Sequence, residues 1–424
     1  MNFKRRNFMT RAAAAVGFSA IASHRAFSQQ AKVGANDKIT VAGIGLGPRG
    51  REVIKSFLSQ ADVRFVAIAD VQMERSEIIR KTVNRHYGNE DCKAYSDMQE
   101  ILGRDDIDAV LIATGDRWHG TASIMAARAG KDIYCEKPCT MSIAECRELD
   151  EAVLTNKRIY QGGMQRRNVD NFQLAAHLAR TGRLGKLKTL HAGIWLPRPV
   201  KANLPAEPEP DAGILDWNRW VGPAPARPYN QKYVRSQWRH YEGFSAGWGL
   251  HDWASHTVNL CQWAVAADDT TPVEFWFQDD QLRARYANGV ELVMRLAGFK
   301  DEGGWLGLGS CPVRFEGEKG WVEAGDFSKI ACSEGLIAAG EKPAEMLGID
   351  PSKHVREFLD SIKSRKATAC NSSIVRTTEV ACHAAAISWK LGRKLKFDPA
   401  KESFIDDAEA NALCAYQRRP PFTI

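Results

Sequence analysis

Long apolar runs are missing from this sequence. Beyond its first 28 residues, no stretch reaches the roughly 18 apolar residues that a membrane-spanning helix needs. The chain also lacks internal repeats and low-complexity tracts. These absences argue against a membrane-spanning protein and against a repeat architecture.

Paired cysteine spacing is missing as well. No C-x-x-C motif and no other paired cysteine spacing typical of a metal site occurs, so no metal site is predicted. Several cysteines lie in apolar runs, where we expect reduced core residues. The ten cysteines are Cys92, Cys135, Cys139, Cys146, Cys261, Cys311, Cys332, Cys370, Cys382 and Cys414.

Acidic residues are absent from residues 1–28. This segment carries five basic residues, a weakly apolar stretch at 12–22 and a small-x-small pattern at 26–28. With the adjacent Arg5 and Arg6, this order is typical of a twin-arginine export signal. We therefore expect a periplasmic or extracellular protein. The alternative is a basic amphipathic helix that stays attached. Export of folded chains would also leave buried thiols reduced.

The predicted mature chain has almost no net charge. The formal charge of +7 includes five positive charges from the leader, and their removal leaves 53 basic against 51 acidic residues. A nearly neutral chain gives no support for a nucleic-acid surface. With 44% hydrophobic and 26% charged residues, the 424-residue chain has an ordinary globular composition and is long enough for two domains.

Residues 38–160 alternate short apolar runs with helical segments. Strict alternation of this kind predicts an α/β domain with a doubly wound parallel sheet. Strands are expected at 39–44, 63–69, 109–113 and 132–138. Helices are expected at 51–59, 71–87, 123–129 and 143–154, with a short helix before the third strand.

Residues 161–424 have a different pattern, which predicts a mainly antiparallel sheet with helices on one face. Asn288-Gly289 between two alternating runs is the strongest hairpin signal in the chain. Proline-rich residues 197–228 indicate a long ordered loop. Strands are expected at 187–195, 273–277, 282–286, 290–296, 313–315 and 321–323, and helices at 252–263, 354–364 and 374–391.

A glycine-rich turn, GIGLGPRG, follows the first predicted strand. A register starting at Gly43 would need glycine at Pro48, whereas Gly45-x-Gly47-x-x-Gly50 fits fully. Such glycines permit a tight turn, close approach of a pyrophosphate and close helix packing. Phosphate would lie at the N-terminus of a helix that starts near Pro48.

Asp70 ends the second predicted strand, twenty residues after Gly50. A carboxylate there accepts hydrogen bonds from the adenine ribose and repels a 2′-phosphate, which favours NAD over NADP. This order of strand, glycines, helix, strand and acidic residue argues against a loop with a purely structural role. Arg49 and Arg75 complete the predicted dinucleotide contacts.

Two further segments carry candidate catalytic groups. Lys137 follows the fourth strand, at the edge where open α/β sheets bind ligands, and an ammonium there stabilises an alkoxide. Asp252 and His256 are four residues apart, so on a helix they share one face, where imidazole can accept a proton. A solvated lysine and an ordinary helix-face pair are the plain alternatives. As a metal site, Asp-x-x-x-His alone is weak.

The combination of these motifs with Glu136-Lys137-Pro138 resembles the Gfo/Idh/MocA oxidoreductases over residues 38–424, including the ending ANALCAYQRRPPF. The resemblance implies a Rossmann domain joined to an α/β domain with an open, mainly antiparallel sheet. It implies a catalytic group of Lys137, Asp252 and His256. One departure is Gly115, where many relatives have proline.

The same resemblance implies further contacts. On the cofactor side these are Thr114, Asp116, His119, Glu136, Lys137 and Gln165. On the substrate side these are Arg166 and Arg167.

Aromatic and basic residues crowd residues 238–253. Aromatic faces stack on sugar rings and arginines supply fixed hydrogen-bond forks, so a saccharide or cyclitol is the expected substrate class. Tryptophans of an ordinary core are the competing explanation. The predicted substrate contacts here are Tyr241, Trp248, His251 and Trp253.

Three functions remain open from the sequence. The first is an NAD-dependent dehydrogenase for a secondary hydroxyl of a sugar, sugar derivative or cyclitol. The second is a redox-neutral glycoside hydrolase with tightly held NAD, which suits a compartment with little free NAD. The third is a non-catalytic secreted carbohydrate-binding protein. A homodimer or homotetramer is expected, because exposed sheets in such second domains often pair.

Overall fold

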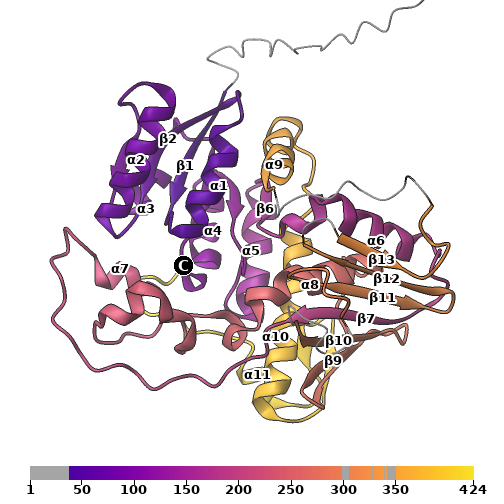
Figure 1. Cartoon of the computed structure of the whole chain (residues 1–424). Coiled ribbons are helices and arrows are strands. Elements are labelled where there is room, and N and C mark those ends of the chain that lie inside the picture. The colour runs from indigo at the N-terminus through magenta and orange to yellow at the C-terminus, as the bar shows by residue number, and fades with distance from the viewer. Residues whose placement is uncertain (1–37, 298–304, 327–328, 339, 341–349) are drawn as a thin grey trace, which may run out of the picture. The chain divides into compact units, whose positions relative to one another are not determined.

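Two β-sheets organise the chain (Figure 1). This computed structural model describes residues 38–297, 305–326, 329–338, 340 and 350–424. The predicted export signal at residues 1–28 lies outside the described residues. Residues 38–424 form one compact unit. None of the helices in the described ranges has the length and apolar character required for a bilayer crossing.

The first sheet has six parallel strands in the order β3-β2-β1-β4-β5-β6, which confirms the predicted doubly wound parallel sheet. Its central strands are buried almost throughout, as expected for strands covered on both faces. The strands are β1 (Ile39–Ile44), β2 (Val63–Ala69), β3 (Lys93–Tyr95), β4 (Ala109–Ile112), β5 (Asp132–Cys135) and β6 (Tyr160–Gly162).

The helices of this half are α1 (Pro48–Leu58), α2 (Met73–Tyr87), α3 (Met98–Leu102), α4 (Asp116–Arg128) and α5 (Ile143–Thr155). Helix α4 begins at Asp116, well before the predicted start at 123. Its first turns are buried on all sides, so they show no amphipathic period from which a helix could be predicted. Strands β3 and β6 were not predicted, because three residues are too few for a period.

The second sheet has nine strands in the order β13-β12-β11-β7-β10-β9-β8-β14-β15, which confirms a mainly antiparallel sheet. The Asn288-Gly289 turn joins β9 to β10 as predicted, and Gly289 has a positive φ of 87°. The exception is the parallel pairing of β10 with β7. The strands are β7 (Leu187–Ile194), β8 (Glu274–Gln278), β9 (Gln281–Arg285), β10 (Glu291–Leu296), β11 (Val313–Gly317), β12 (Gly320–Gly325), β13 (Lys329–Cys332), β14 (Leu395–Asp398) and β15 (Ser403–Phe404).

Helices α6 (Asp170–Arg180), α8 (His251–Ala264) and α10 (Ser372–Leu391) pack on this sheet and share its largest hydrophobic core. Helix α10 also contacts α5, and α9 (Ser352–Ser364) packs against α1 through Phe358 and Phe57, whose ring centroids are 6.3 Å apart. The short helix α11 (Ala408–Ala412) precedes the C-terminal segment. The late helices therefore connect the two sheets.

A long excursion between β7 and α8 holds the short helix α7 (Trp217–Val221) and its own aromatic core. Trp217 and Trp220 stack with centroids 4.9 Å apart. The excursion touches the first sheet's side of the molecule, because a Cβ at Gly222 would lie 2.2 Å from the indole nitrogen of Trp118. Aromatic packing therefore orders the proline-rich segment that the sequence predicts to be a loop.

Candidate active site

The glycine turn after β1 has the geometry that the preferred register requires. Gly45 has a φ of +68°, and a Cβ there would lie 2.3 Å from the Thr114 side chain. A Cβ at Gly50 would lie 2.9 Å from Leu46, so α1 could not pack as closely on the turn. Gly47 precedes α1, whose first residue is Pro48. Gly45 and Gly50 thus each have a separate steric reason.

A cavity of about 380 Å³ opens at this turn. A Cβ at Gly47 would have only the Arg75 guanidinium within 4 Å, at 3.8 Å, so the backbone faces open space. Free N–H groups at the start of α1 make this a suitable cradle for a pyrophosphate. The residues present therefore fit a dinucleotide.

Asp70 lies in the wall of the same cavity, at the end of β2. One carboxylate oxygen accepts a hydrogen bond from the Gln72 amide at 2.9 Å. Burial raises the pKa of Asp70 to about 6, and the nearby charges of Arg75 and Arg51 oppose the rise. The group is therefore charged at neutral pH and can accept hydrogen bonds from a ribose.

Glu136 anchors a buried polar chain beside the glycine turn. Its Oε1 accepts hydrogen bonds from Arg49 Nε at 3.1 Å and from Gln165 Nε2 at 2.8 Å. Arg49 and Thr114 both lie in the wall of the dinucleotide cavity. These predicted cofactor-side residues come together from the start of α1 and from the segments that follow β4, β5 and β6.

His119 links the loop at Thr114 to the loop at Pro138. One ring nitrogen lies 2.6 Å from the Pro138 carbonyl and the other 3.2 Å from the Thr114 carbonyl, and burial lowers the pKa of His119 to about 4. Asp116 is also buried, which raises its pKa to about 6, and it accepts a hydrogen bond from the Ala246 amide at 3.3 Å. Both residues thus support the loops around the cavity.

Lys137 and Asp252 join the two halves of the site. The Lys137 ammonium donates hydrogen bonds to the Asp252 carbonyl at 2.6 Å and to its Oδ1 at 3.2 Å. Burial opposes ionisation of Asp252, but the charges of Lys137 and Arg239 hold the pKa of Asp252 below its ordinary value. The contacts leave the third N–H of the ammonium for a ligand.

His256 lies one turn after Asp252 on α8 and is only 6% exposed. Its Nδ1 is buried and has no hydrogen-bond partner among the described residues. Burial, reinforced by the charges of Arg166 and Lys137, holds the pKa of His256 well below its ordinary value. The imidazole is therefore neutral at pH 7 and can accept a proton.

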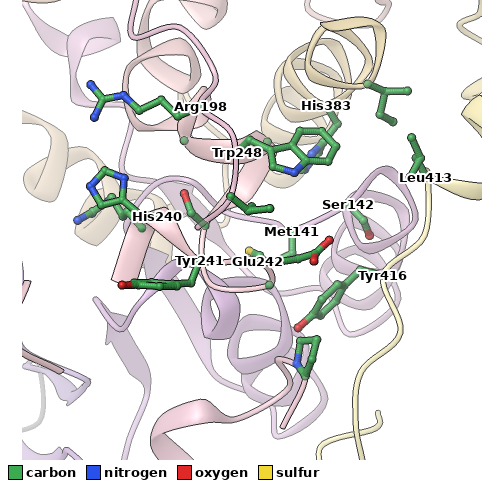
Figure 2. A pocket seen from close by; sticks show the side chains of 18 of the residues that line it. Met141, Ser142, Arg198, His240, Tyr241, Glu242, Trp248, His383, Leu413 and Tyr416 are labelled. Carbon is green, nitrogen blue, oxygen red and sulfur yellow. The ribbon is translucent and has the colours of Figure 1, made fainter. Parts of the chain in front are cut away.

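Asp252 lies in the wall of a larger cavity of about 730 Å³. Figure 2 shows part of this wall, with Tyr241, Trp248 and Tyr416 among the labelled side chains. Its wall combines aromatic faces with charged groups, the mixture that binds rings carrying several hydroxyls. Arg239 lies in the walls of both cavities, and its Nε is 3.4 Å from Asp252 Oδ1. Lys137 and His256 are not among the described wall residues of either cavity; Lys137 contacts Asp252, and His256 lies one turn after Asp252 on α8. The aromatic and charged lining comprises Trp195, Tyr241, Trp248, Tyr416, Arg198, Arg239, Glu242 and Asp252.

Three residues predicted to bind substrate are held elsewhere. Arg166 forms a two-point ion pair with Asp326 at 3.0 and 2.8 Å. Arg167 donates to Asn259 at 2.7 Å and to Asp268. His251 is fully buried against Glu379. None of the three lies in the described wall of either cavity.

The remaining predicted substrate residues lie closer to the larger cavity. Tyr241 and Trp248 line it, and Trp248 has a positive φ of 54°. Trp253 packs edge-on against Trp195, a wall residue, with centroids 5.2 Å apart. Aromatic crowding in the sequence thus indicated this cavity better than the arginine pair did.

Sequence reasoning missed the contribution of the C-terminal segment. Tyr416 and Arg418 line the larger cavity, and Arg418 is held by Glu145 at 2.9 Å and Thr121 at 3.0 Å. Only tertiary folding brings this segment there, and no local pattern reports it. Arg239 belongs to the aromatic and basic stretch 238–253, but no sequence signal predicts that it lines two cavities.

Family comparisons agree with this geometry. Residues 38–164 match the profile of the oxidoreductase family's NAD-binding Rossmann fold, and residues 195–424 match that of its C-terminal alpha/beta domain. The chain belongs to the Gfo/Idh/MocA oxidoreductase family, and its first half is an NAD-binding Rossmann domain.

Individual relatives are more distant. A 2,7-anhydro-N-acetylneuraminate hydratase of Mediterraneibacter gnavus is 27% identical over 149 residues, covering 35% of this chain and 37% of its own. A myo-inositol 2-dehydrogenase of Thermotoga maritima is 29% identical over 143 residues, covering 34% and 41%. The chain thus spans about two fifths of the length of these curated relatives.

The fold is shared with solved structures. An aldose-aldose oxidoreductase from Caulobacter crescentus, complexed with glycerol, superposes with a TM-score of 0.60 at 20% identity, covering 85% of this chain and 100% of that one. At this identity the likeness establishes the fold alone.

Proposed function

We propose that the protein is an NAD-dependent oxidoreductase that acts on a secondary hydroxyl of a sugar, sugar derivative or cyclitol. The observation that carries this proposal is the position of the Lys137–Asp252 pair. Asp252 lines the 730 Å³ cavity, and Arg239, which contacts Asp252, lines the dinucleotide cavity as well.

NAD, when bound, supplies the acceptor for the hydride that leaves the carbinol carbon. The chain's own residues handle the hydroxyl. The free N–H of Lys137 donates to the hydroxyl oxygen and stabilises negative charge on it. The neutral imidazole of His256 accepts the hydroxyl proton. Asp252 holds Lys137 in place through two hydrogen bonds.

The cavity wall supports a polyhydroxylated ring as substrate. Tyr241, Trp248 and Tyr416 offer aromatic faces, while Arg198 and Glu242 offer hydrogen-bonding groups for hydroxyls. The relatives named above are a 2,7-anhydro-N-acetylneuraminate hydratase and a myo-inositol 2-dehydrogenase, and the compounds in both names belong to this chemical class.

The proposal is tested with purified mature protein, NAD and a panel of cyclitols, free sugars and anhydro-sugars. Reduction of NAD should accompany oxidation of at least one substrate. When the carbinol carbon carries deuterium, one deuterium should be transferred to NAD for each substrate molecule oxidised. If every substrate that binds leaves NAD oxidised while Lys137→Met binds substrate equally well, the dehydrogenase proposal fails.

A redox-neutral reaction is a second candidate, favoured by the hydratase relative. Oxidation of one sugar carbon acidifies the neighbouring C–H bond, so a leaving group can be eliminated, water added and the hydride returned. The distinguishing measurement is turnover of glycosides or anhydro-sugars by dialysed protein without added NAD. Cofactor that remains bound through dialysis, with no net NADH formed, would favour this candidate.

Export through the twin-arginine route to the periplasm or beyond is part of the proposal. Replacement of Arg5 and Arg6 by lysine should keep the protein in the cytoplasm, and unaffected export would contradict this assignment. We also propose a homodimer or homotetramer, which mass photometry of the mature protein tests directly.

A further inference from the structure

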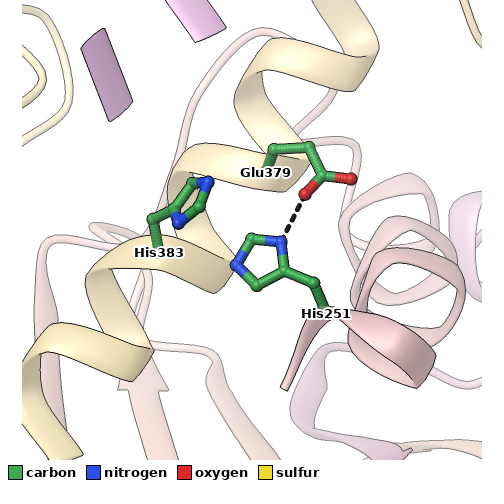
Figure 3. Close-up of side chains that lie close together, drawn as sticks. All are labelled: His251, Glu379 and His383. Atoms are coloured by element: carbon green, nitrogen blue, oxygen red, sulfur yellow. Dashed lines mark hydrogen bonds and ion pairs between the residues drawn. The ribbon is translucent and has the colours of Figure 1, made fainter. Parts of the chain in front are cut away.

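A buried cluster of His251, Glu379 and His383 has no role in the proposed reaction (Figure 3). His251 begins α8, while Glu379 and His383 are one turn apart on α10 and therefore share a face of that helix. One donor atom from each residue lies within 4.8 Å of the others. The cluster thus converges from two helices on one small volume.

The hydrogen bond inside the cluster leaves a nitrogen free. His251 Nδ1 pairs with Glu379 Oε2, which favours the proton on Nδ1 and a lone pair on Nε2. That Nε2 is buried and has no hydrogen-bond partner among the described residues. It faces His383, whose ring centroid is 4.1 Å from that of His251 (Figure 3). Leaving such an atom unpaired costs about 1–3 kcal/mol, so the arrangement favours a ligand there.

We propose that His251 Nε2 and His383 bind a divalent transition-metal ion of the Zn²⁺ class, with Glu379 accepting the Nδ1–H hydrogen bond of His251. Imidazole nitrogens are common zinc ligands, and a carboxylate that accepts the other N–H of a ligating histidine fixes the orientation of its ring. Bonds of about 2.0–2.1 Å at tetrahedral angles separate two ligand atoms by about 3.4 Å, and rings with centroids 4.1 Å apart can reach this spacing by side-chain rotation. The ion keeps an open position for water or a ligand, whereas Ca²⁺ or Mg²⁺ would need a shell of oxygens.

The surroundings suit a metal. Glu379 Oε1 accepts a hydrogen bond from the Cys139 amide at 3.4 Å, which orients the carboxylate. His383 lies in the wall of the 730 Å³ cavity, so an ion can enter from it. The open position would then be close to the cavity that we assign to substrate. Thr140 Oγ1 lies 3.5 Å from His383 Nε2 and is the adjoining hydroxyl.

The first test is metal binding by the purified full-length mature protein after treatment with a chelator. Competition between the protein and a chromophoric zinc indicator should give one Zn²⁺ per chain. Glu379→Gln should weaken binding by about 10-fold or more, and His383→Asn by about 100-fold or more. His177→Asn removes an exposed histidine on α6 and is the matched control, which should leave the affinity unchanged.

The second test uses Co²⁺ and needs no variant. A bound ion should give the intense visible bands of a four-coordinate nitrogen and oxygen site, without a thiolate charge-transfer band. No binding by the wild-type protein, or equal affinity in wild type and His383→Asn with matching circular dichroism spectra, would overturn the proposal. In that case the cluster is a hydrogen-bonded link between α8 and α10. Neither readout depends on dehydrogenase activity.

Discussion

Two polar clusters start from neighbouring residues of α8. Asp252 joins Lys137 and has a side chain that is 32% exposed, whereas the side chain of His251 is 0% exposed and pairs with the equally buried Glu379. Successive helical residues point about 100° apart, so one turn of helix serves both clusters. We call Lys137, Asp252 and His256 the open cluster, and His251, Glu379 and His383 the closed cluster. The open cluster can exchange partners with a ligand, while the closed cluster can accept only a small ion.

Removal of the ammonium should break the open cluster. Lys137→Met keeps the length of the side chain but loses the charge that stabilises the alkoxide, and turnover should fall by about 10²- to 10⁴-fold. NAD affinity, measured by calorimetry, should change little. The control, Lys55→Met, removes an exposed lysine of α1 and should be indistinguishable from wild type. Unchanged turnover in Lys137→Met would contradict its catalytic role.

The imidazole of the open cluster can be tested by pH. Because burial holds the pKa of His256 well below 6.5, the base stays unprotonated at mildly acidic pH. Turnover at saturating NAD should therefore persist below pH 6.5 and decline only at lower pH. His256→Asn should lower turnover by about 10²-fold or more and remove that acid limb. An acid limb centred at or above pH 6.5 in the wild type would refute this account.

Disruption of the closed cluster should lower the free energy of unfolding. Without metal, Glu379→Gln weakens a buried charge-assisted hydrogen bond, so the free energy of unfolding should fall by about 1–3 kcal/mol. Denaturant titration in the presence of a chelator measures this change. Glu151→Gln, at an exposed position of α5, should stay within about 0.5 kcal/mol of wild type. A loss equal to that of the control would show that the pair contributes nothing.

Asp70 combines features of both clusters, since it is buried yet faces a cavity. With a pKa raised to about 6, its carboxylate is charged above that pH and protonated below it. NAD affinity should therefore weaken as the pH falls through 6. Asp70→Asn should bind NAD about fivefold more weakly at pH 8 and lose this pH dependence. Asp105→Asn serves as the exposed control, and a pH dependence retained in Asp70→Asn would disprove the assignment.

Arg239 should give the smallest effect. Its side chain is 41% exposed and its contact with Asp252 is 3.4 Å long, so the pair contributes about 0.2–1 kcal/mol. Arg239→Gln should raise the apparent KM by about two- to fivefold with little change in kcat. Arg128→Gln is the exposed control. A large fall in kcat would instead place Arg239 among the reacting groups.

Much of the first sheet and its cofactor turn could be predicted from the sequence, because local signals determine them. Buried strands, glycines and Asp70 each report a short-range requirement. The helical spacing also placed Asp252 and His256 correctly on one face of α8. The second sheet was predicted only in outline, because its β7–β10 pair joins strands that are far apart in the chain and leaves no local pattern.

The sequence indicated Lys137, Asp252 and His256 as the charged residues of the candidate site, but it did not indicate which surrounding residues line the cavities. Arg166 and Arg167 follow β6 closely, and their sequence gave no sign that Asp326 and Asp268 would pair with them. Glu379 and His383 do have a local signal, the Glu-x-x-x-His spacing on a helix. That spacing acquires meaning only when His251, far away in the chain, folds against it.

The excursion that carries α7 has a consequence for engineering. Trp220, Val234 and Trp238 from this segment line the same dinucleotide cavity as the glycine turn. Chimeras that exchange residues 38–164 between relatives would transplant the cradle without these wall residues. Cofactor preference and retention in such hybrids would then follow the recipient's excursion as much as the donor's glycines.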